Sequence, residues 1–348
     1  MKIALDATYS IGEQLSGVGL YSREILLGMA ASHPETRFDF CYRPHRYLRA
    51  WGGALPPNAR RRLLAEPLGP RFADVFHGLN QRLPRLPLRR AVATFHDLFV
   101  MTGEYSTPEF RARFTAQARQ AAERAGILIA VSEFTRTQVV SLLGVEASRV
   151  VVVRHGIRPL AYPRRAGKPR EKVVLHVGAI QTRKNVARLV EAFEALDREW
   201  RLVLAGSFGY GADRIRARIE SSPARERISV LGYVEPDSLA AWYARAAIFA
   251  FPSLDEGFGM PVLEAMAGGA PVLTSNRSAL PEVAGDAAIL VDPENSEALI
   301  AALRGLAGDE GLRQDLSARG LARSRLFTWE KAVRETWEVY EEALRRLP

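Results

Sequence analysis

Residues 251–282, FPSLDEGFGMPVLEAMAGGAPVLTSNRSALPE, contain the most informative pattern of the sequence. An apolar run over residues 247–251 predicts a buried strand, which turns at Pro252 and Ser253. An acidic, glycine-rich loop over residues 255–259 leads into a short helix with Pro261 at its first position, where a missing N–H costs least. The helix ends at the two glycines 268–269, and a second apolar run follows at once. This succession is typical of a parallel α/β sheet.

Outward from this stretch, apolar runs and helical patterns alternate along the whole chain. Strands are predicted in the first half at residues 2–7, 37–42, 74–78, 91–96, 126–131 and 150–155, with helices at 19–31 and 108–125. In the second half strands are predicted at 173–177, 201–205, 228–231, 247–251, 271–274 and 288–291, with helices at 185–196, 212–221, 238–244 and 296–306. Near-continuous apolar strands separated by helices predict two Rossmann-like, doubly wound parallel sheets.

The chain of 348 residues is about twice the length of a typical domain. A proline- and charge-rich segment, LAYPRRAGKPREK at residues 160–172, reads as a linker. We therefore expect a first domain over residues 1–160, a linker over 161–172 and a second domain over 173–326. Residues 327–348 form a terminal amphipathic helix in this interpretation. Two such sheets leave a cleft along their carboxyl edges, where ligands of these folds bind.

Two carboxylates flank the predicted helix start after residue 259. Its free N–H groups, around residues 259–262, favour an anion, above all a phosphate. Glu256 lies in the loop and Glu264 one turn into the helix, and a carboxylate can accept hydrogen bonds from both hydroxyls of a cis-diol. The hypothesis is a sugar-nucleotide site, with phosphates on the helix end and hydroxyls on the glutamates. The alternative is that the glutamates serve only the helix dipole.

Two adjacent cations, Arg183 and Lys184, follow the first strand of the second half, at the start of a helix. Positive charge at a helix start opposes the dipole, so a compensating anion is expected. A diphosphate would supply it, with the arginine as a planar fork and the lysine as a point charge.

The first half offers two weaker candidates. Gly17 and Gly19 begin a GxG pattern, but Ser22 stands where a dinucleotide fingerprint has its third glycine, and a tight turn explains the pair equally well. His96 and Asp97 end a strand, where the histidine could donate a hydrogen bond to a sugar hydroxyl or a phosphate. The alternative for His96 is a histidine that only holds the loop.

The run EGFGMPVLEAMAGGAPV resembles the E-x7-E signature of the retaining glycosyltransferases of family four, which have the two-domain GT-B fold. Glu256 and Glu264 match its two glutamates. Similar segments, SGVG, HDLF, RKN and the terminal FTWEKAVRETWEVY, extend the resemblance over nearly the whole chain. It implies transfer of a hexose from a nucleoside-diphosphate sugar to a glycan or lipid-linked acceptor, with a terminal helix that crosses back to the first domain. GDP-mannose is the favoured donor and UDP-glucose the alternative.

The resemblance also implies roles for individual residues. Glu256, with His96, belongs to the catalytic set and binds donor-sugar hydroxyls, while Asp97 faces the acceptor. The remaining donor-binding residues are Gly17, Gly19, Arg183, Lys184, Val234, Gly257, Phe258, Gly259, Met260, Val262 and Glu264, the last of these on the ribose. Two positions depart from the family pattern: Ala179 stands where many members have arginine, and His155 where asparagine is usual. We favour a structural role for His155.

No metal or other cofactor is expected beside the donor, because the chain has no Asp-x-Asp motif and the cations can neutralise the leaving group. Other activities of the same fold remain as alternatives: a sugar-nucleotide epimerase or a phosphorylase. A two-carboxylate glycosidase would have no use for the phosphate-binding residues. A catalytically silent nucleotide-sugar-binding module is the alternative outside enzymes.

The net charge of +9 is uneven, since residues 1–165 carry 24 Lys and Arg against 13 Asp and Glu. The excess of positive charge concentrates between residues 43 and 90, where arginines alternate with aromatic residues that we expect at the surface. This combination favours contact with an anionic membrane surface. The alternative is a solvated arginine-rich face. No nucleic-acid-binding motif is present, so nucleic acid is discounted. One cysteine, no leader pattern and no apolar run of membrane-span length predict a cytoplasmic protein, peripheral at the inner face of the membrane.

Overall fold

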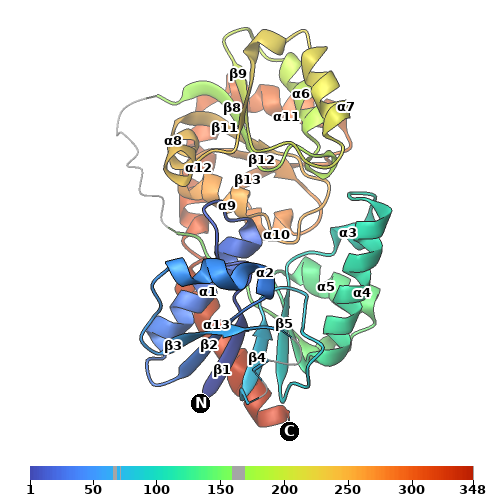
Figure 1. Ribbon diagram of the computed structural model, residues 1–348. Coiled ribbons are helices and arrows are strands. Elements are labelled where there is room, and N and C mark those ends of the chain that lie inside the picture. Colours follow the sequence, from blue (N-terminus) through green and yellow to red (C-terminus); the bar gives the residue numbers. More distant parts are fainter. Residues whose placement is uncertain (66–68, 71, 159–168, 348) are drawn as a thin grey trace. The chain divides into compact units, whose positions relative to one another are not determined.

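The computed structural model describes residues 1–65, 69–70, 72–158 and 169–347 (Figure 1). The chain divides into two compact units. Unit 1 contains Met1–Thr102, Thr107–Gly156 and Thr328–Pro348, and unit 2 contains Gly103–Ser106 and Ile157–Phe327. Most of the predicted linker, residues 160–168, and Arg71 of the basic segment lie outside the described residues.

Unit 1 is built on a parallel sheet in the order β3-β2-β1-β4-β5-β6-β7. Its strands are β1 (Lys2–Asp6), β2 (Arg37–Tyr42), β3 (Ala59–Leu63), β4 (Val75–Gly78), β5 (Ala91–Phe95), β6 (Ile127–Ala130) and β7 (Val150–Val152). The connecting helices are α1 (Gly17–Ser32), α2 (Pro44–Tyr47), α3 (Phe99–Thr102), α4 (Pro108–Arg124) and α5 (Glu133–Leu143), with short 3₁₀ turns η1 (Leu48–Gly52) and η2 (Ala147–Arg149).

The terminal helix α13 (Trp329–Arg346) belongs to unit 1, where it lies against α1, β4 and β5 (Figure 1). A buried polar network fastens it to the sheet. The Tyr340 hydroxyl lies 2.6 Å from Nδ1 of His77, whose Nε2 lies 2.8 Å from Oγ1 of Thr94. Burial, with His96 nearby, lowers the pKa of His77 to about 3, so this imidazole is neutral. The terminal stretch thus completes the first domain, as the resemblance implied.

Unit 2 has a parallel sheet in the order β10-β9-β8-β11-β12-β13. Its strands are β8 (Glu171–Val177), β9 (Arg201–Ala205), β10 (Ile228–Gly232), β11 (Ala246–Phe251), β12 (Val272–Ser275) and β13 (Ala288–Val291). Its helices are α6 (Val186–Glu194), α7 (Ala212–Glu220), α8 (Pro236–Arg245), α9 (Met260–Ala267), α10 (Leu280–Ala284), α11 (Ser296–Gly308) and α12 (Glu310–Ser324), with 3₁₀ turns η3 (Thr182–Lys184) and η4 (Arg225–Arg227).

The strand order reverses once in each sheet, between β1 and β4 in unit 1 and between β8 and β11 in unit 2. Loops that leave the carboxyl ends of the two strands at such a point diverge to opposite faces of the sheet and leave a crevice between them. In unit 2 the loop after β8 carries Arg183 and Lys184, and the loop after β11 carries Glu256. Topology alone therefore brings the predicted site residues of this unit to one place.

The predicted fold class is confirmed: each unit is a doubly wound parallel sheet. The prediction missed β3 and the helices α2, α3, α5, α10 and α12. The strand β3 reads ARRRL and alternates between half-buried and exposed residues at the edge of the sheet, so it has no apolar run. Helix α12 carries few apolar residues, since it buries chiefly small side chains such as Ser317 and Gly320.

Candidate active site

Two cations converge on one carboxylate oxygen at the crevice of unit 2. Arg183 Nη1 lies 2.9 Å, and Lys184 Nζ 2.5 Å, from Oε1 of Glu256. The Ser253 hydroxyl donates to the same oxygen at 2.6 Å. All four side chains are buried. Within the described residues no hydrogen bond reaches the other oxygen, Oε2, which leaves an acceptor of this glutamate open to a ligand.

The charges of this cluster fix the ionisation of Glu256. Burial favours the neutral acid, but the Arg183 and Lys184 cations and the hydrogen bonds from Lys184 and Ser253 outweigh it and lower the pKa of Glu256 to about 2. The ammonium of Lys184 also lies over the Phe251 ring, 4.6 Å from its centroid. The expectation that a diphosphate compensates the two cations is corrected in part, because Glu256 already supplies one negative charge.

The second glutamate, Glu264, is half-buried on α9 and is held from the neighbouring helix α8. The buried Tyr243 hydroxyl donates to its Oε2 at 2.7 Å. Burial raises the pKa of Glu264, and the hydrogen bond from Tyr243 offsets this in part. In the described part of the chain its Oε1 accepts no hydrogen bond. Each glutamate of the pair thus has one oxygen held by the protein and one available.

The start of α9 offers fewer donors than the sequence suggested. The helix begins at Met260, so Pro261 is its second residue, without an N–H. The Val262 N–H donates to the Gly259 carbonyl at 3.0 Å, and the Val262 side chain is buried in the core. The prediction of free N–H groups over residues 259–262 is therefore wrong at two of these four positions.

The packing around α9 explains the residue types at two positions of the loop before it. Gly259 has φ 110°, and a β-carbon there would lie 2.7 Å from Cδ2 of Leu280, so conformation and space both require glycine. Phe258 is buried and meets the Phe327 ring edge-on at 6.0 Å. Its side chain belongs to the core, and any contact of this residue or of Gly257 with a donor would come from the backbone.

In unit 1, His96 and Asp97 line a cavity of about 530 Å³ at the carboxyl ends of β4 and β5, together with Val18 from the first turn of α1. His96 Nε2 lies 2.9 Å from the Leu79 carbonyl oxygen, which can only accept, so the ring proton is on Nε2. Burial lowers the pKa of His96 to about 4, although the Leu79 hydrogen bond opposes this. The neutral ring can only accept at Nδ1. The predicted donor role for His96 is corrected to that of an acceptor.

The His96 ring packs against buried aromatic and imidazole rings. His155 stacks on it at 5.3 Å between ring centroids, and Tyr21 meets it edge-on at 4.7 Å. Tyr21 and Trp329 also contact His155, at 4.9 Å and 6.0 Å. This packing accounts for a structural role of His155.

The two glycines near the start of α1 differ in their surroundings. Helix α1 begins at Gly17, so the predicted start at residue 19 is wrong and both glycines lie in the first turn, capped by the Ser16 hydroxyl. A β-carbon at Gly19 would lie 2.8 Å from the Tyr9 carbonyl oxygen, whereas nothing lies within 4 Å of one at Gly17. Gly19 is thus required by packing, and only Gly17 faces open space.

Val234 lies half-buried in the loop between β10 and α8, beside the exposed Tyr233. No group of three or more His, Cys, Asp or Glu side chains that could hold a metal ion occurs among the described residues. In the same part of the chain, no helix combines the length and apolar character needed to cross a membrane.

Comparison with known proteins identifies the chain. The sequence profile described as "Glycosyl transferases group 1" matches residues 161–323, and that described as "Glycosyltransferase Family 4" matches residues 28–159. O-antigen chain mannosyltransferase B of Escherichia coli is 33% identical over 282 residues, which span 77% of this chain and 74% of the relative. This chain belongs to glycosyltransferase family 4. It is an enzyme that transfers glycosyl groups.

Solved structures confirm the GT-B fold of this glycosyltransferase. Sucrose-phosphate synthase from Thermosynechococcus elongatus superposes with a TM-score of 0.81 at 22% identity, over 99% of both chains. Anabaena HepE in complex with UDP-glucose gives a TM-score of 0.74 at 18% identity, over 98% of this chain and all of the other. At these identities the likeness shows the fold.

Sequence reasoning missed three residues of the unit 2 site in this glycosyltransferase. Ser253 and Tyr243 each hold one glutamate, and the Ser278 hydroxyl accepts the backbone N–H of Glu256 at 3.1 Å. Ser278 has φ 57°, the left-handed region that a serine rarely adopts. Its place in the polar run TSNRS, which begins in β12 and continues past its end, was the one available signal.

Proposed function

We propose that this enzyme transfers a hexose with retention of anomeric configuration from a nucleoside-diphosphate sugar to a glycan or lipid-linked acceptor, without a metal, in polysaccharide or glycoconjugate biosynthesis. The observation that carries the proposal is the pairing of Arg183 and Lys184 with a single oxygen of Glu256, with the second oxygen open. This arrangement places two cations suited to a diphosphate beside an acceptor for sugar hydroxyls.

The chemistry asked of these residues is mainly electrostatic. The bond between the anomeric carbon and the diphosphate oxygen breaks through an oxocarbenium-like transition state, and negative charge accumulates on the diphosphate. Arg183 and Lys184 are fixed in place before the reaction, so they stabilise this charge without reorganising. The acceptor oxygen bonds to the anomeric carbon on the same face, and its proton passes to an oxygen of the leaving phosphate. No protein nucleophile is required.

The two glutamates divide the donor between them in this proposal. Glu256 accepts hydrogen bonds from hydroxyls of the donor sugar through Oε2, while its Oε1 stays with the cations. Glu264 accepts from the ribose through Oε1, with Tyr243 fixing its other oxygen. The low pKa of Glu256 keeps its carboxylate ionised, and both of its oxygens then accept hydrogen bonds.

The favoured donor is GDP-mannose, and UDP-glucose is the alternative. The name of the E. coli relative, O-antigen chain mannosyltransferase B, supports mannose and a cell-surface polysaccharide. The donor-binding residues named from the sequence, Val234 included, do not distinguish guanine from uracil.

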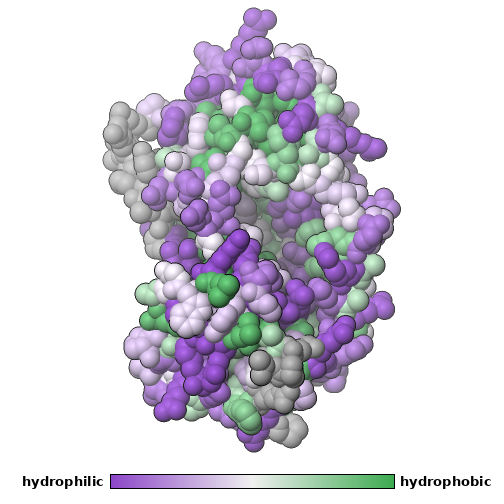
Figure 2. All heavy atoms as spheres, in the orientation of Figure 1, coloured by the Kyte–Doolittle hydropathy of each residue, from purple (hydrophilic) through white to green (hydrophobic). Residues whose placement is uncertain are grey.

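The proposal includes contact with an anionic membrane surface through α2 and η1 of unit 1. Leu48 and Trp51 expose 82% and 60% of their surface. In the sequence Arg49 lies between these two residues, and Arg46 lies two residues before Leu48. Figure 2 shows hydrophobic side chains among hydrophilic ones on the face that carries these elements. Apolar side chains within a basic segment suit the headgroup region of an anionic bilayer. A lipid-linked acceptor would be met at that surface.

Ligand binding tests the donor site. Thermal unfolding is measured with GDP, UDP, TDP, ADP and NAD, with and without EDTA, for the wild type, Glu264→Ala and the exposed-site control Glu226→Ala. We expect saturable stabilisation by one nucleoside diphosphate, equal in EDTA and in the control, and weaker in Glu264→Ala. A response to NAD alone, or to no diphosphate, would refute the proposal.

Membrane contact has its own test. Sedimentation with anionic phosphatidylglycerol vesicles should capture the wild type at low salt and release it at high salt, since surface charges are screened. Trp51→Ala should bind less than the wild type. Equal recovery of both proteins in the supernatant at every salt concentration would remove the membrane from the proposal and leave the transferase activity untouched.

A further inference from the structure

A polar groove runs along one side of unit 1. A cavity of about 690 Å³ lies between α4 and the segment around residue 85, lined by Arg85, Arg113, Gln117, Gln120 and Arg124 among others. It shares Arg113 and Gln117 with the cavity that contains His96 and Asp97. The two cavities are therefore neighbours along α4, with these two side chains at their boundary, and the pair is here called the α4 groove.

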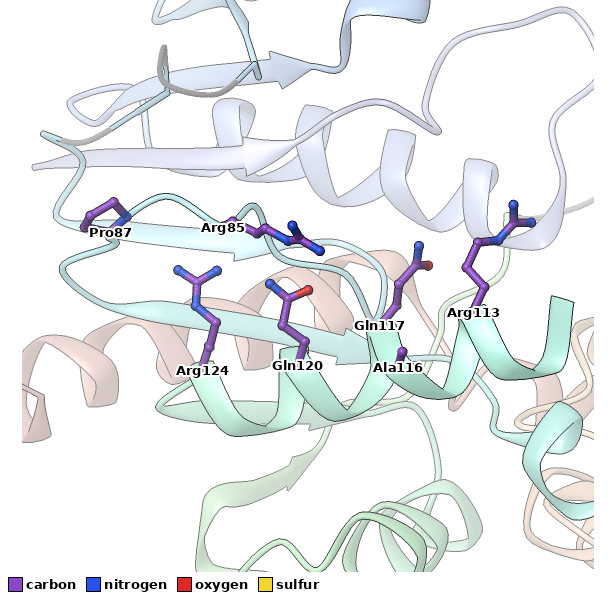
Figure 3. Close-up of a pocket in the computed structure, with 7 residues that line it drawn as sticks. All are labelled: Arg85, Pro87, Arg113, Ala116, Gln117, Gln120 and Arg124. Atoms are coloured by element: carbon purple, nitrogen blue, oxygen red, sulfur yellow. The ribbon is translucent and has the colours of Figure 1, made fainter. Parts of the chain in front are cut away.

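The sequence of α4 explains how the groove is built. Residues 113, 117, 120 and 124 follow one another at spacings of four, three and four, which places them on one face of the helix. The opposite face buries Ala118, Ala121 and Ala122 against the sheet. Figure 3 shows Gln117, Gln120 and Arg124 pointing from α4 toward the segment that carries Arg85. At 1.5 Å per residue the stripe is about 16 Å long, which suits an extended chain.

The wall of the groove is held independently of any ligand. Arg124 donates through both guanidinium nitrogens to the Pro84 and Leu86 carbonyl oxygens, and so fixes the opposite wall to the helix. The amides of Gln117 and Gln120 are half-buried, and in the described part of the chain neither makes a hydrogen bond. Two amides are thus presented to the groove by a rigid frame.

The chemistry of the lining selects a class of occupant. An amide offers both a donor and an acceptor, which matches vicinal hydroxyls, and guanidinium groups donate to hydroxyl or acidic oxygens. At the junction of the two cavities, Arg113 lies over the Phe110 ring, 5.5 Å from its centroid, and Phe110 is 40% exposed. The cavity between α4 and residue 85 has no carboxylate in its lining and no extended apolar wall for a hydrocarbon chain.

We propose that the α4 groove binds the acceptor glycan behind its reacting end, so that the enzyme recognises several sugar residues of a growing chain. The inference rests on the proposed transferase function and adds the class of acceptor. The neighbouring cavity at His96 and Asp97 supports it, because the two cavities share Arg113 and Gln117 and Asp97 is the predicted acceptor residue. An acceptor long enough to reach Gln117 and Gln120 should bind more tightly than a short one.

Direct binding separates this inference from the transferase activity. The full chain is titrated against an array of oligosaccharides of two to eight residues from bacterial surface polysaccharides, without any donor. We expect at least one series in which affinity rises about tenfold beyond the disaccharide. The double variant Gln117→Ala/Gln120→Ala should lose that gain, whereas Arg119→Ala, an exposed change on another face of α4, should keep it. Equal melting temperatures show that both variants fold.

Three outcomes would overturn the inference: no array glycan binds, affinity is independent of chain length, or the double variant retains the full gain. Capture of the wild type but not the double variant by phosphatidylglycerol vesicles would assign the groove to lipid instead. Failure of the transferase proposal is recognised separately, because nucleoside-diphosphate binding is tested by thermal unfolding and by a variant of unit 2, Glu264→Ala. Neither involves the α4 groove. With a turnover assay, the double variant should raise KM for long acceptors only and leave kcat unchanged.

Discussion

Replacing Glu256 by glutamine should cost much of the stability of unit 2. The pKa of this carboxyl falls from 4.5 to about 2 in the folded chain. At about 1.4 kcal/mol per pKa unit, the ionised form stabilises the fold by about 3 kcal/mol at pH 7. Glutamine mimics the protonated acid and removes the carboxylate charge that Arg183 and Lys184 pair with at Glu256 Oε1, which destabilises the buried cluster.

The pH dependence has a definite sign. Because the folded pKa is depressed, the contribution is complete above the unfolded pKa and is lost as the pH falls toward about 2. The difference between wild type and Glu256→Gln should therefore shrink from about 3 kcal/mol at pH 7 to about 1 kcal/mol at pH 3.

Urea unfolding of the full chain at both pH values measures this difference, with the exposed Glu226→Gln as control, expected within about 0.5 kcal/mol of the wild type. The variant removes one negative charge, so it should still bind a nucleoside diphosphate while losing turnover. A loss of stability below about 1 kcal/mol at pH 7, or a loss that does not depend on pH, would refute this reading of the cluster.

Three further changes probe the site. Gly17→Ala should leave the melting temperature unchanged, because a β-carbon there has no atom within 4 Å. The same change should raise KM for the donor, because Gly17 is predicted to bind it; an unchanged KM would contradict this donor-binding role. Tyr243→Phe should weaken nucleoside-diphosphate binding about tenfold by freeing Glu264, but weaken the 2′-deoxy analogue much less; equal losses in a titration would exclude a ribose contact. Ser278→Ala and Ser278→Gly should lower kcat equally, while only the glycine variant relieves about 1 kcal/mol of left-handed strain in a melting experiment; unchanged kcat would deny it a positioning role.

Local patterns were enough to predict most of the fold and the grouping of the donor residues. The apolar runs at residues 201–205 and 288–291 became β9 and β13 without change of bounds. In a parallel sheet the carboxyl ends of the strands share one edge, so the loops of Lys184 and Glu256 had to lie near each other. The sequence therefore predicted the features that depend only on strand order or on residues within one loop.

Contacts between distant segments could not be predicted in the same way. Tyr243 is 21 residues from Glu264, and His77 is 263 residues from Tyr340, so no local pattern links either pair. The tautomer of His96 depends on the Leu79 carbonyl, which sequence reasoning cannot place. The ion pair between Lys184 and Glu256 could not be predicted either, because local patterns do not show that a carboxylate of the protein lies beside this cation.

The most direct test of the central claim is transfer itself. GDP-mannose or UDP-glucose is incubated in EDTA with a fluorescent alkyl mannoside and with the array oligosaccharides, and the linkage of any product is determined by proton NMR. We expect a product that keeps the α configuration of the donor, formed by the wild type and not by Lys184→Ala. An inverted product, activity that EDTA abolishes, or full activity in Lys184→Ala would contradict it.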